Sequence, residues 1–108
     1  MNPEELGRLM EQAQAVQSKL AALQQDLALR RFEGASGGGM VTAVVTGAMR
    51  VYEVRIEPSL LERGDLEMLQ DLTAAALNAA LDYAQSTVQA ELQRASAALQ
   101  IPLPTNAS

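Results

Sequence analysis

The chain has 108 residues with 8 basic and 13 acidic side chains, giving a net charge of −5 and room for one domain. It contains no Cys, His or Trp, which excludes zinc fingers, Cys-His nucleophiles and Ser-His-Asp triads. No apolar run approaches the ~18 residues of a membrane span, and no signal-peptide pattern opens the chain. We therefore expect a soluble, cytoplasmic protein with no membrane partner. The acidic balance argues at first sight against a nucleic-acid binder.

The first segment predicts one long helix from Pro3 to about Arg31, capped by Asn2. Its apolar residues recur in alternating steps of three and four, which is a strict heptad seam and indicates packing along a partner helix. The seam consists of Leu6, Leu9, Ala13, Val16, Leu20, Leu23 and Leu27.

The middle segment changes to a period of two and predicts three short strands, at residues 32–36, 40–46 and 49–57. Gly37-Gly38-Gly39 predicts the first hairpin turn and Thr46-Gly47-Ala48 the second tight connection. One face of the predicted sheet is apolar, so we expect it to be covered on that side. The alternating apolar residues are Val41, Ala43 and Val45 in one strand and Tyr52, Val54 and Ile56 in the next.

A second long helix is predicted from Asp65, its cap, to about Leu99, after a short helical turn at residues 58–61. Its Ala-rich stretch at residues 74–80 allows another backbone to approach closely. Pro102 and Pro104 end the helical pattern. We therefore expect one domain over residues 1–101 and a flexible tail over residues 102–108.

Helix lengths indicate the shape of the molecule. At about 1.5 Å per residue the two helices are ~40 and ~50 Å long, whereas strands of this length span only ~20–27 Å. The helices must therefore project beyond the sheet, and we expect the N-terminal part of the first to pair with the C-terminal part of the second. A sheet this narrow has too small a core of its own, which favours a dimer.

The order of elements and an ordered series of short matches resemble the YbaB/EbfC family of small bacterial nucleoid-associated proteins. The matches run from about residue 5 to residue 100 without a large gap. They are the stretches at residues 9–14 (LMEQAQ), 34–41 (GASGGGMV), 46–48 (TGA), 54–61 (VRIEPSLL), 67–72 (EMLQDL) and 76–80 (ALNAA).

This resemblance implies an α+β fold and a homodimer in which strands of both chains form a central sheet and long helices project as arms. It implies binding of double-stranded DNA with low sequence preference, which alters DNA conformation, compacts or protects the nucleoid and influences gene expression. It implies no catalytic activity, no cofactor and no small-molecule substrate. The residues that we then expect at the dimer interface are Val41, Ala43, Val45, Tyr52, Val54 and Ile56.

The candidate DNA contacts are basic residues on the helices. Arg8, Lys19 and Arg30 are each eleven positions apart, which returns a helix to nearly the same face, and Gln12 lies close to that line. Such a stripe can follow a phosphate backbone, or it can be the solvated face of a coiled coil. Arg94 joins the stripe near Arg8 if the helices pair antiparallel at their tips. Arg30 has an alternative role in pairing with Glu33 or with the end of its own helix.

The remaining polar groups have local explanations. Arg55 shares a strand face with Glu53 and Glu57, so ion pairing is its default role. The glycines at residues 34–39 lack the Gly-Lys-Ser/Thr that follows in a phosphate-binding loop, and they join two strands. The acidic residues at positions 65–71 suit a helix N-terminus, so we expect neither a catalytic nor a metal site.

The alternative function is a non-catalytic interaction module whose helical arms grip a protein partner, which the acidic balance and the apolar seam favour. The distribution of charge keeps the DNA hypothesis open. Residues 1–63 hold seven basic and eight acidic residues, a net charge of −1, whereas residues 64–108 hold one basic and five acidic residues, a net charge of −4. Any DNA-binding surface is thereby confined to the first helix and the far tip of the second.

Overall fold

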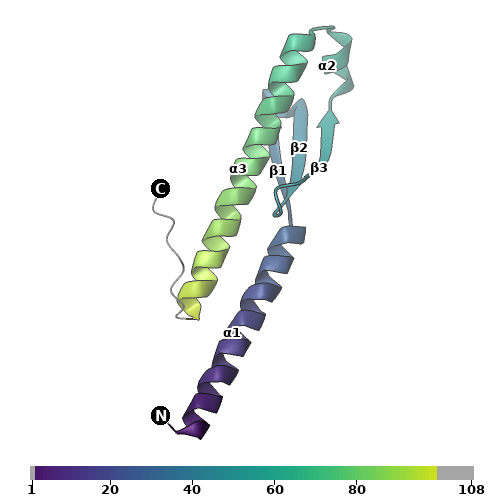
Figure 1. Cartoon of the computed structure of the whole chain (residues 1–108). Helices are drawn as coiled ribbons and strands as arrows, with labels where there is room; N and C mark the ends of the chain where they lie inside the picture. The colour runs from purple at the N-terminus through teal and green to yellow at the C-terminus, as the bar shows by residue number, and fades with distance from the viewer. Residues whose placement is uncertain (1, 100–108) are drawn as a thin grey trace.

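The computed structural model describes residues 2–99 as two long helices joined by a three-stranded sheet (Figure 1). The sheet is antiparallel in the order β1-β2-β3. The predicted α+β architecture is confirmed, and the expected tail at residues 102–108 lies outside the described part. The elements are α1 (Pro3–Leu29), β1 (Arg31–Ser36), the short 3₁₀ helix η1 (Gly37–Gly39), β2 (Val41–Thr46), β3 (Val51–Ile56), α2 (Pro58–Glu62) and α3 (Leu66–Ala98).

Both long helices begin at the predicted caps. The Asn2 side chain accepts a hydrogen bond of 2.8 Å from the Glu5 N–H, and Asp65 accepts one of 3.0 Å from the Met68 N–H. Each cap satisfies a backbone donor that the first helical turn leaves unpaired. The end of α1 comes slightly earlier than predicted, because Arg30 turns to an extended conformation while its N–H still bonds the last turn.

The core lies between α3 and one face of the sheet. Val41, Ala43 and Val45 of β2 are buried there against the small side chains that α3 presents. Gly34 of β1 faces the same helix so closely that a Cβ at this position would lie 2.7 Å from the Ala76 carbonyl oxygen. The predicted close approach to the Ala-rich stretch is confirmed, and it brings β1 and α3 together backbone to backbone.

The third strand differs from its prediction at its start. Met49 adopts a φ of 61°, in the left-handed region, so it belongs to the turn and β3 begins at Val51. The pairing with β2 then shifts, with Val45 opposite Val51 and Val44 opposite Glu53. Tyr52 is the extra residue of this β-bulge, and the Arg31 guanidinium lies 3.8 Å from the centre of its ring. The bulge therefore interrupts the alternation that the sequence predicted.

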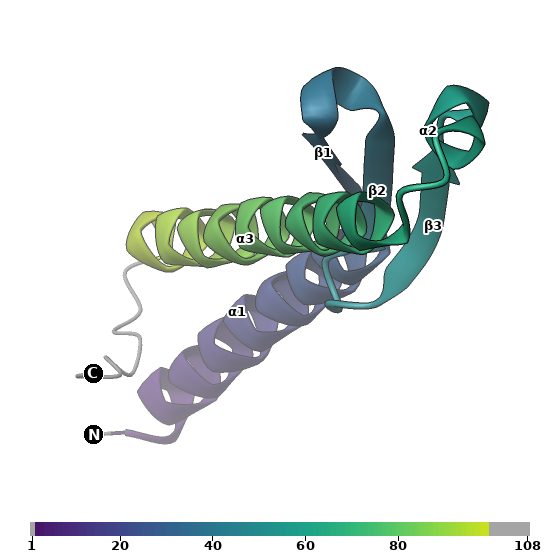
Figure 2. The same cartoon turned by 90° about the horizontal axis from the view of Figure 1, so that it is seen from above.

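α1 runs antiparallel to α3 and beside its C-terminal half (Figures 1 and 2). Gly47, in the turn after β2, holds the end of α1, since its N–H donates to the Arg30 carbonyl and its Cα packs on the Leu27 backbone. The expected pairing of the helix ends is wrong in register, because the N-terminal part of α1 extends beyond the end of α3 (Figure 1). Instead, the C-terminal half of α1, which is nearest the sheet, lies beside the C-terminal half of α3 (Figure 1).

Candidate nucleic-acid interface

The cationic stripe of α1 is continuous in the structure. Arg8 and Lys19 lie within the single helix, and Arg30 follows its last residue. Eleven residues turn an α-helix by about three full turns with only ~20° of drift, so these side chains leave nearly the same face. Gln12 lies one turn from Arg8 and is exposed like it. This part of the predicted site is therefore geometrically one surface.

Arg30 and Arg94 share one carboxylate. The Arg30 Nη1 and the Arg94 Nη1 each lie 3.7 Å from the same Oε1 of Glu91. Arg30 also donates to the Asp26 carboxylate, with 3.1 Å between Nη2 and Oδ2. Ion pairs at an exposed site are weak, so both cations keep access to solvent and to an incoming phosphate.

Arg94 does not lie beside Arg8, where antiparallel pairing of the helix tips would have placed it. Because Arg94 shares Glu91 with Arg30, it sits at the sheet end of α1. Arg8 is twenty-two residues earlier in the helix, which at about 1.5 Å per residue is ~33 Å away. The candidate residues thus lie near the two ends of α1, with Arg8 and Gln12 at one end, Arg30 and Arg94 at the other, and Lys19 between them. Glu91 was not among the predicted site residues. The feature of the sequence that indicates its role is its i,i+3 spacing from Arg94, which allows an ion pair on one helix.

Arg8 and Lys19 differ from the other candidates in their surroundings. Within residues 2–99, neither of them takes part in an ion pair, whereas Arg30, Arg55 and Arg94 do. They also lie on the exposed part of α1. Glu5, Arg8, Leu9 and Gln12 line a shallow depression of about 320 Å³ on this helix. The neighbouring carboxylate of Glu5 lowers the positive potential there without neutralising it at contact distance.

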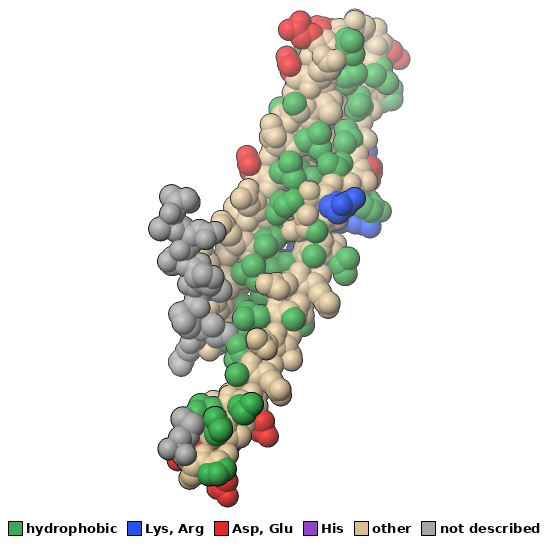
Figure 3. Space-filling view, in the orientation of Figure 1, with side chains coloured by type: hydrophobic (Ala, Val, Ile, Leu, Met, Phe, Trp, Pro, Cys, Tyr) green, Lys and Arg blue, Asp and Glu red, His purple; other side chains and the backbone are tan. Residues whose placement is uncertain are grey.

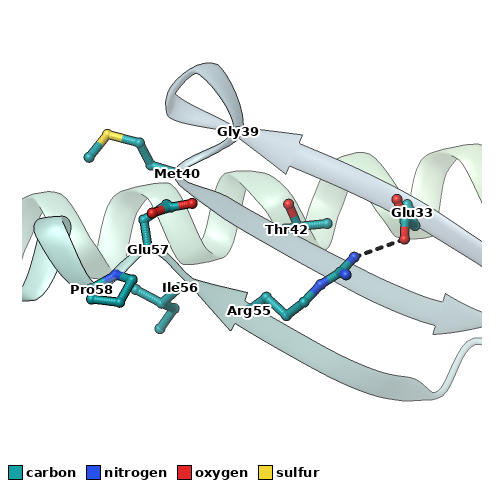
Figure 4. Close-up of a pocket in the computed structure, with 8 residues that line it drawn as sticks. All are labelled: Glu33, Gly39, Met40, Thr42, Arg55, Ile56, Glu57 and Pro58. Atoms are coloured by element: carbon teal, nitrogen blue, oxygen red, sulfur yellow. Dashed lines mark hydrogen bonds and ion pairs between the residues drawn. The ribbon is translucent and has the colours of Figure 1, made fainter.

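The cations of the sheet are engaged with other side chains. Arg55 lies 2.8 Å from Glu33 on β1 (Figure 4). It also lies 3.3 Å from Glu53 on its own strand. The predicted ion pairing of Arg55 on a solvated face is confirmed for Glu53. Arg55 also borders a groove of about 300 Å³ on the outer side of the sheet, together with Thr42 and Glu57. These side chains form a polar surface of mixed charge.

The residues expected at the dimer interface separate into two sets. Val41, Ala43 and Val45 are fully buried inside the single chain and offer no surface to a second copy. On the free edge of the sheet, Tyr52 is 53% exposed and Val54 37%, while Ile56 is half-buried. Val51, which the sequence analysis did not single out, is 55% exposed on the same edge. An apolar residue within a predicted strand is expected to be buried, so the sequence does not reveal that Val51 is exposed.

Hydrophobic side chains run between the two long helices on one face of the molecule, and acidic side chains gather at its two far ends (Figure 3). In the described part of the chain no helix is apolar over the length that a membrane crossing requires. Nor do residues 2–99 bring together three acidic, His or Cys side chains around a common point for a metal ion.

Comparison with known proteins gives consistent results. The family model described as the YbaB/EbfC DNA-binding family matches residues 1–99. A nucleoid-associated protein of Syntrophobacter fumaroxidans is 40% identical over 93 residues, which cover 86% of this chain and 84% of that protein. A nucleoid-associated protein of Desulfotalea psychrophila is 37% identical over 102 residues, covering 94% and 96%. The crystal structure of an uncharacterized protein from Helicobacter pylori has the same fold, with a TM-score of 0.59, 24% identity and coverage of 73% and 92%.

Proposed function

This chain belongs to the YbaB/EbfC DNA-binding family, and on that premise we propose that it binds double-stranded DNA as a nucleoid-associated protein. The family is described by DNA binding and not by a catalytic activity. Its match extends over residues 1–99, so it includes both long helices as well as the sheet. We place the protein in the bacterial cytoplasm, on the nucleoid.

The structural observation that carries the proposal is the pair of unpaired cations on α1. Arg8 and Lys19 contact phosphate oxygens, and the Gln12 amide donates a hydrogen bond between them. Contacts of this kind position a protein on DNA without reading its sequence. The low sequence preference that we propose follows from the small number of such groups and from the scarcity of aromatic side chains able to insert between bases.

Arg30 and Arg94 provide a second, weaker point of contact. Phosphate oxygens compete with the Glu91 carboxylate for both guanidinium groups. The groups near the two ends of α1 are separated by ~33 Å along the helix, about one turn of B-DNA. One face of α1 can therefore contact DNA phosphates at two points about one helical turn apart.

We further propose a homodimer formed through the free edge of β3. A strand with an unpaired edge and exposed apolar residues is a template for pairing with another strand. Here Val51, Tyr52 and Val54 are exposed, whereas the opposite edge of the strand is paired with β2. Antiparallel pairing of β3 with β3 of a second copy gives one continuous sheet of both chains around a two-fold axis. Such a dimer carries two α1 helices and so binds DNA at two places, which alters its path.

A gel-shift titration of duplex DNA at low salt tests the DNA proposal. We expect binding at micromolar protein, with an affinity that falls as salt rises. Reversal of both cations (Arg8→Glu and Lys19→Glu) abolishes the shift, and reversal of either one alone weakens it strongly. Arg63→Glu makes the same charge change as either single reversal, on an exposed residue next to α2, and weakens the shift only slightly. Absence of a shift at tens of micromolar wild-type protein would refute the proposal and favour a protein partner for the arms.

A further inference from the structure

The N-terminal half of α1 carries an apolar seam that has no partner helix among residues 2–99 of its own chain. Leu6 is 50% exposed, Leu9 49% and Met10 59%, whereas Leu27, in the same seam near the sheet, is 1% exposed. The cause is the register of the two long helices, since α3 ends before it reaches this part of α1 (Figure 1). A strict heptad seam packs against a partner helix, so its exposed half needs a helix from elsewhere.

We propose that this exposed half-seam pairs antiparallel with the same half-seam of a second copy. In heptad terms Leu6 and Ala13 occupy a positions, and Leu9 and Val16 occupy d positions. Antiparallel helices pack a residues against d residues. Leu6 then faces Val16 of the second copy, and Leu9 faces its Ala13. The two-fold axis repeats both contacts, which gives four apolar layers in which a large side chain always meets a smaller or branched one.

The flanking side chains are complementary in the same register. Glu5 and Lys19 occupy g positions, and antiparallel pairing places Glu5 of each copy beside Lys19 of the other. The remaining g residue, Gln12, meets its own counterpart at the axis and can form an amide–amide hydrogen bond. On the other side of the seam Met10, an e residue, meets Met10 of the second copy and adds apolar contact. Neither Glu5 nor Lys19 forms an ion pair within residues 2–99, so both are available.

The length of the helix also fits this pairing. The helix of the second copy begins at its Pro3, which in this register lies level with Lys19 of the first copy. It therefore stops before Leu20, Leu23 and Leu27, the part of the seam nearest the sheet, which is more deeply buried in the single chain. The seam of α1 is thus covered end to end by two different helices, α3 of its own chain and α1 of the second copy.

This contact is distinct from the proposed dimer at β3. The sheet edge and the tip of α1 lie at different ends of the molecule (Figure 1). Two separate self-complementary contacts link copies into open chains, because each pair leaves a free contact at both ends. Arg8 occupies a c position on the outer side of the helix, so it remains accessible to phosphate within such a string of copies. Lys19 has two possible partners, a DNA phosphate and Glu5 of the second copy.

Sedimentation equilibrium without DNA tests the α1 contact by measuring how charge reversal at Glu5 and Lys19 changes the association constant. Wild-type protein should associate beyond a dimer at concentrations up to about 0.5 mM, as expected for a small interface. Glu5→Lys or Lys19→Glu alone turns two attractions into two repulsions and should lower the association constant about tenfold. The double variant restores both pairs with reversed sign and should regain association to within about threefold of wild type.

Glu4→Lys is the matched control, because Glu4 occupies an outward f position and carries the same charge change at the neighbouring residue. It should leave the association constant within about twofold of wild type. An equal loss for Glu4→Lys and Glu5→Lys, or a double variant that associates no better than either single variant, would overturn the proposal. So would a Val51→Lys protein, in which the proposed β3 pairing is blocked, that stays monomeric up to about 0.5 mM.

Cysteine cross-linking tests the register directly, because the chain has no cysteine of its own. A mixture of Leu9→Cys and Ala13→Cys proteins should form a disulfide between the two variants under mild oxidation, faster than either variant alone. Glu11→Cys, at an outward f position, is the control and should cross-link slowly. Cross-linking of Glu11→Cys at the rate of the mixture would refute the register. Because neither experiment contains DNA, the outcome is independent of the proposed function.

Discussion

The backbone of Gly34 in β1 lies directly against the backbone of Ala80 in α3, with no side chain between them. A Cβ on Gly34 would approach not only Ala80 but also the Ala79 carbonyl carbon at 2.8 Å. Real Cβ atoms do not come this close to a backbone, so the sheet and the helix would have to separate. This contact therefore sets how closely α3 can approach the sheet.

Gly34→Ala is therefore expected to lower the free energy of unfolding by about 2–3 kcal/mol. Urea unfolding followed by circular dichroism measures the change. Gly7→Ala is the control, since no atom lies within 4 Å of the added methyl group and the residue is helical. It should be neutral or stabilising by up to about 1 kcal/mol. A Gly34→Ala protein as stable as wild type would contradict the backbone contact.

Arg8→Gln is expected to reduce the salt dependence of DNA binding more than Arg30→Gln. Each phosphate contact that is lost lowers the slope of log affinity against log salt by about 0.9. Arg30 already interacts with Asp26 and Glu91, so its contribution to phosphate binding is smaller. Fluorescence anisotropy of a labelled duplex over a range of salt concentrations gives both slopes. Equal slopes for the two variants would show that the ion pairs of Arg30 do not reduce its contribution to phosphate binding.

Glu91→Gln is expected to strengthen DNA binding, because it releases both Arg30 and Arg94 from one carboxylate. We expect the affinity at low salt to rise about three- to tenfold. Asp82→Asn removes the same charge from an exposed position of α3 that has no ion pair in the described structure, and it should change the affinity less than about twofold. A similar gain in DNA affinity for both variants would mean that the change in net charge, and not the release of Arg30 and Arg94, strengthens binding.

Val51→Lys is expected to convert the dimer that we propose at β3 into a monomer at about 10 μM, well below the ~0.5 mM range of the α1 contact. It places a charge on the free edge of β3, and natural proteins use lysine at such positions to prevent edge pairing. Because Val51 is largely exposed in the single chain, the fold should be retained, which circular dichroism can verify. Light scattering then compares its mass with that of Leu61→Lys, a control with an equally exposed apolar residue in α2. A Val51→Lys protein that is still a dimer at about 10 μM would exclude this edge as the interface.

Much of the fold could be predicted because its determinants are local. The caps at Asn2 and Asp65 and the change of hydrophobic period mark the elements within a few residues of their observed bounds. The start of β3 was misplaced, because Met49 adopts a left-handed conformation that local pattern does not reveal in a non-glycine residue. The bulge at Tyr52 depends in turn on the pairing with β2, which is a non-local property.

The elements, the apolar seam of α1 and the shared face of Arg8, Lys19 and Arg30 follow from local residue spacing, since a helix converts that spacing directly into a face. The register of α1 against α3, by contrast, depends on contacts made in the folded chain. That register follows from backbone contacts at Gly34 and Gly47, between residues far apart in the chain. It places Arg94 beside Arg30 instead of Arg8, and within the described part of the chain it leaves the tip of α1 without a partner helix. Periodicity cannot specify such an offset, because a regular heptad seam looks alike at every turn.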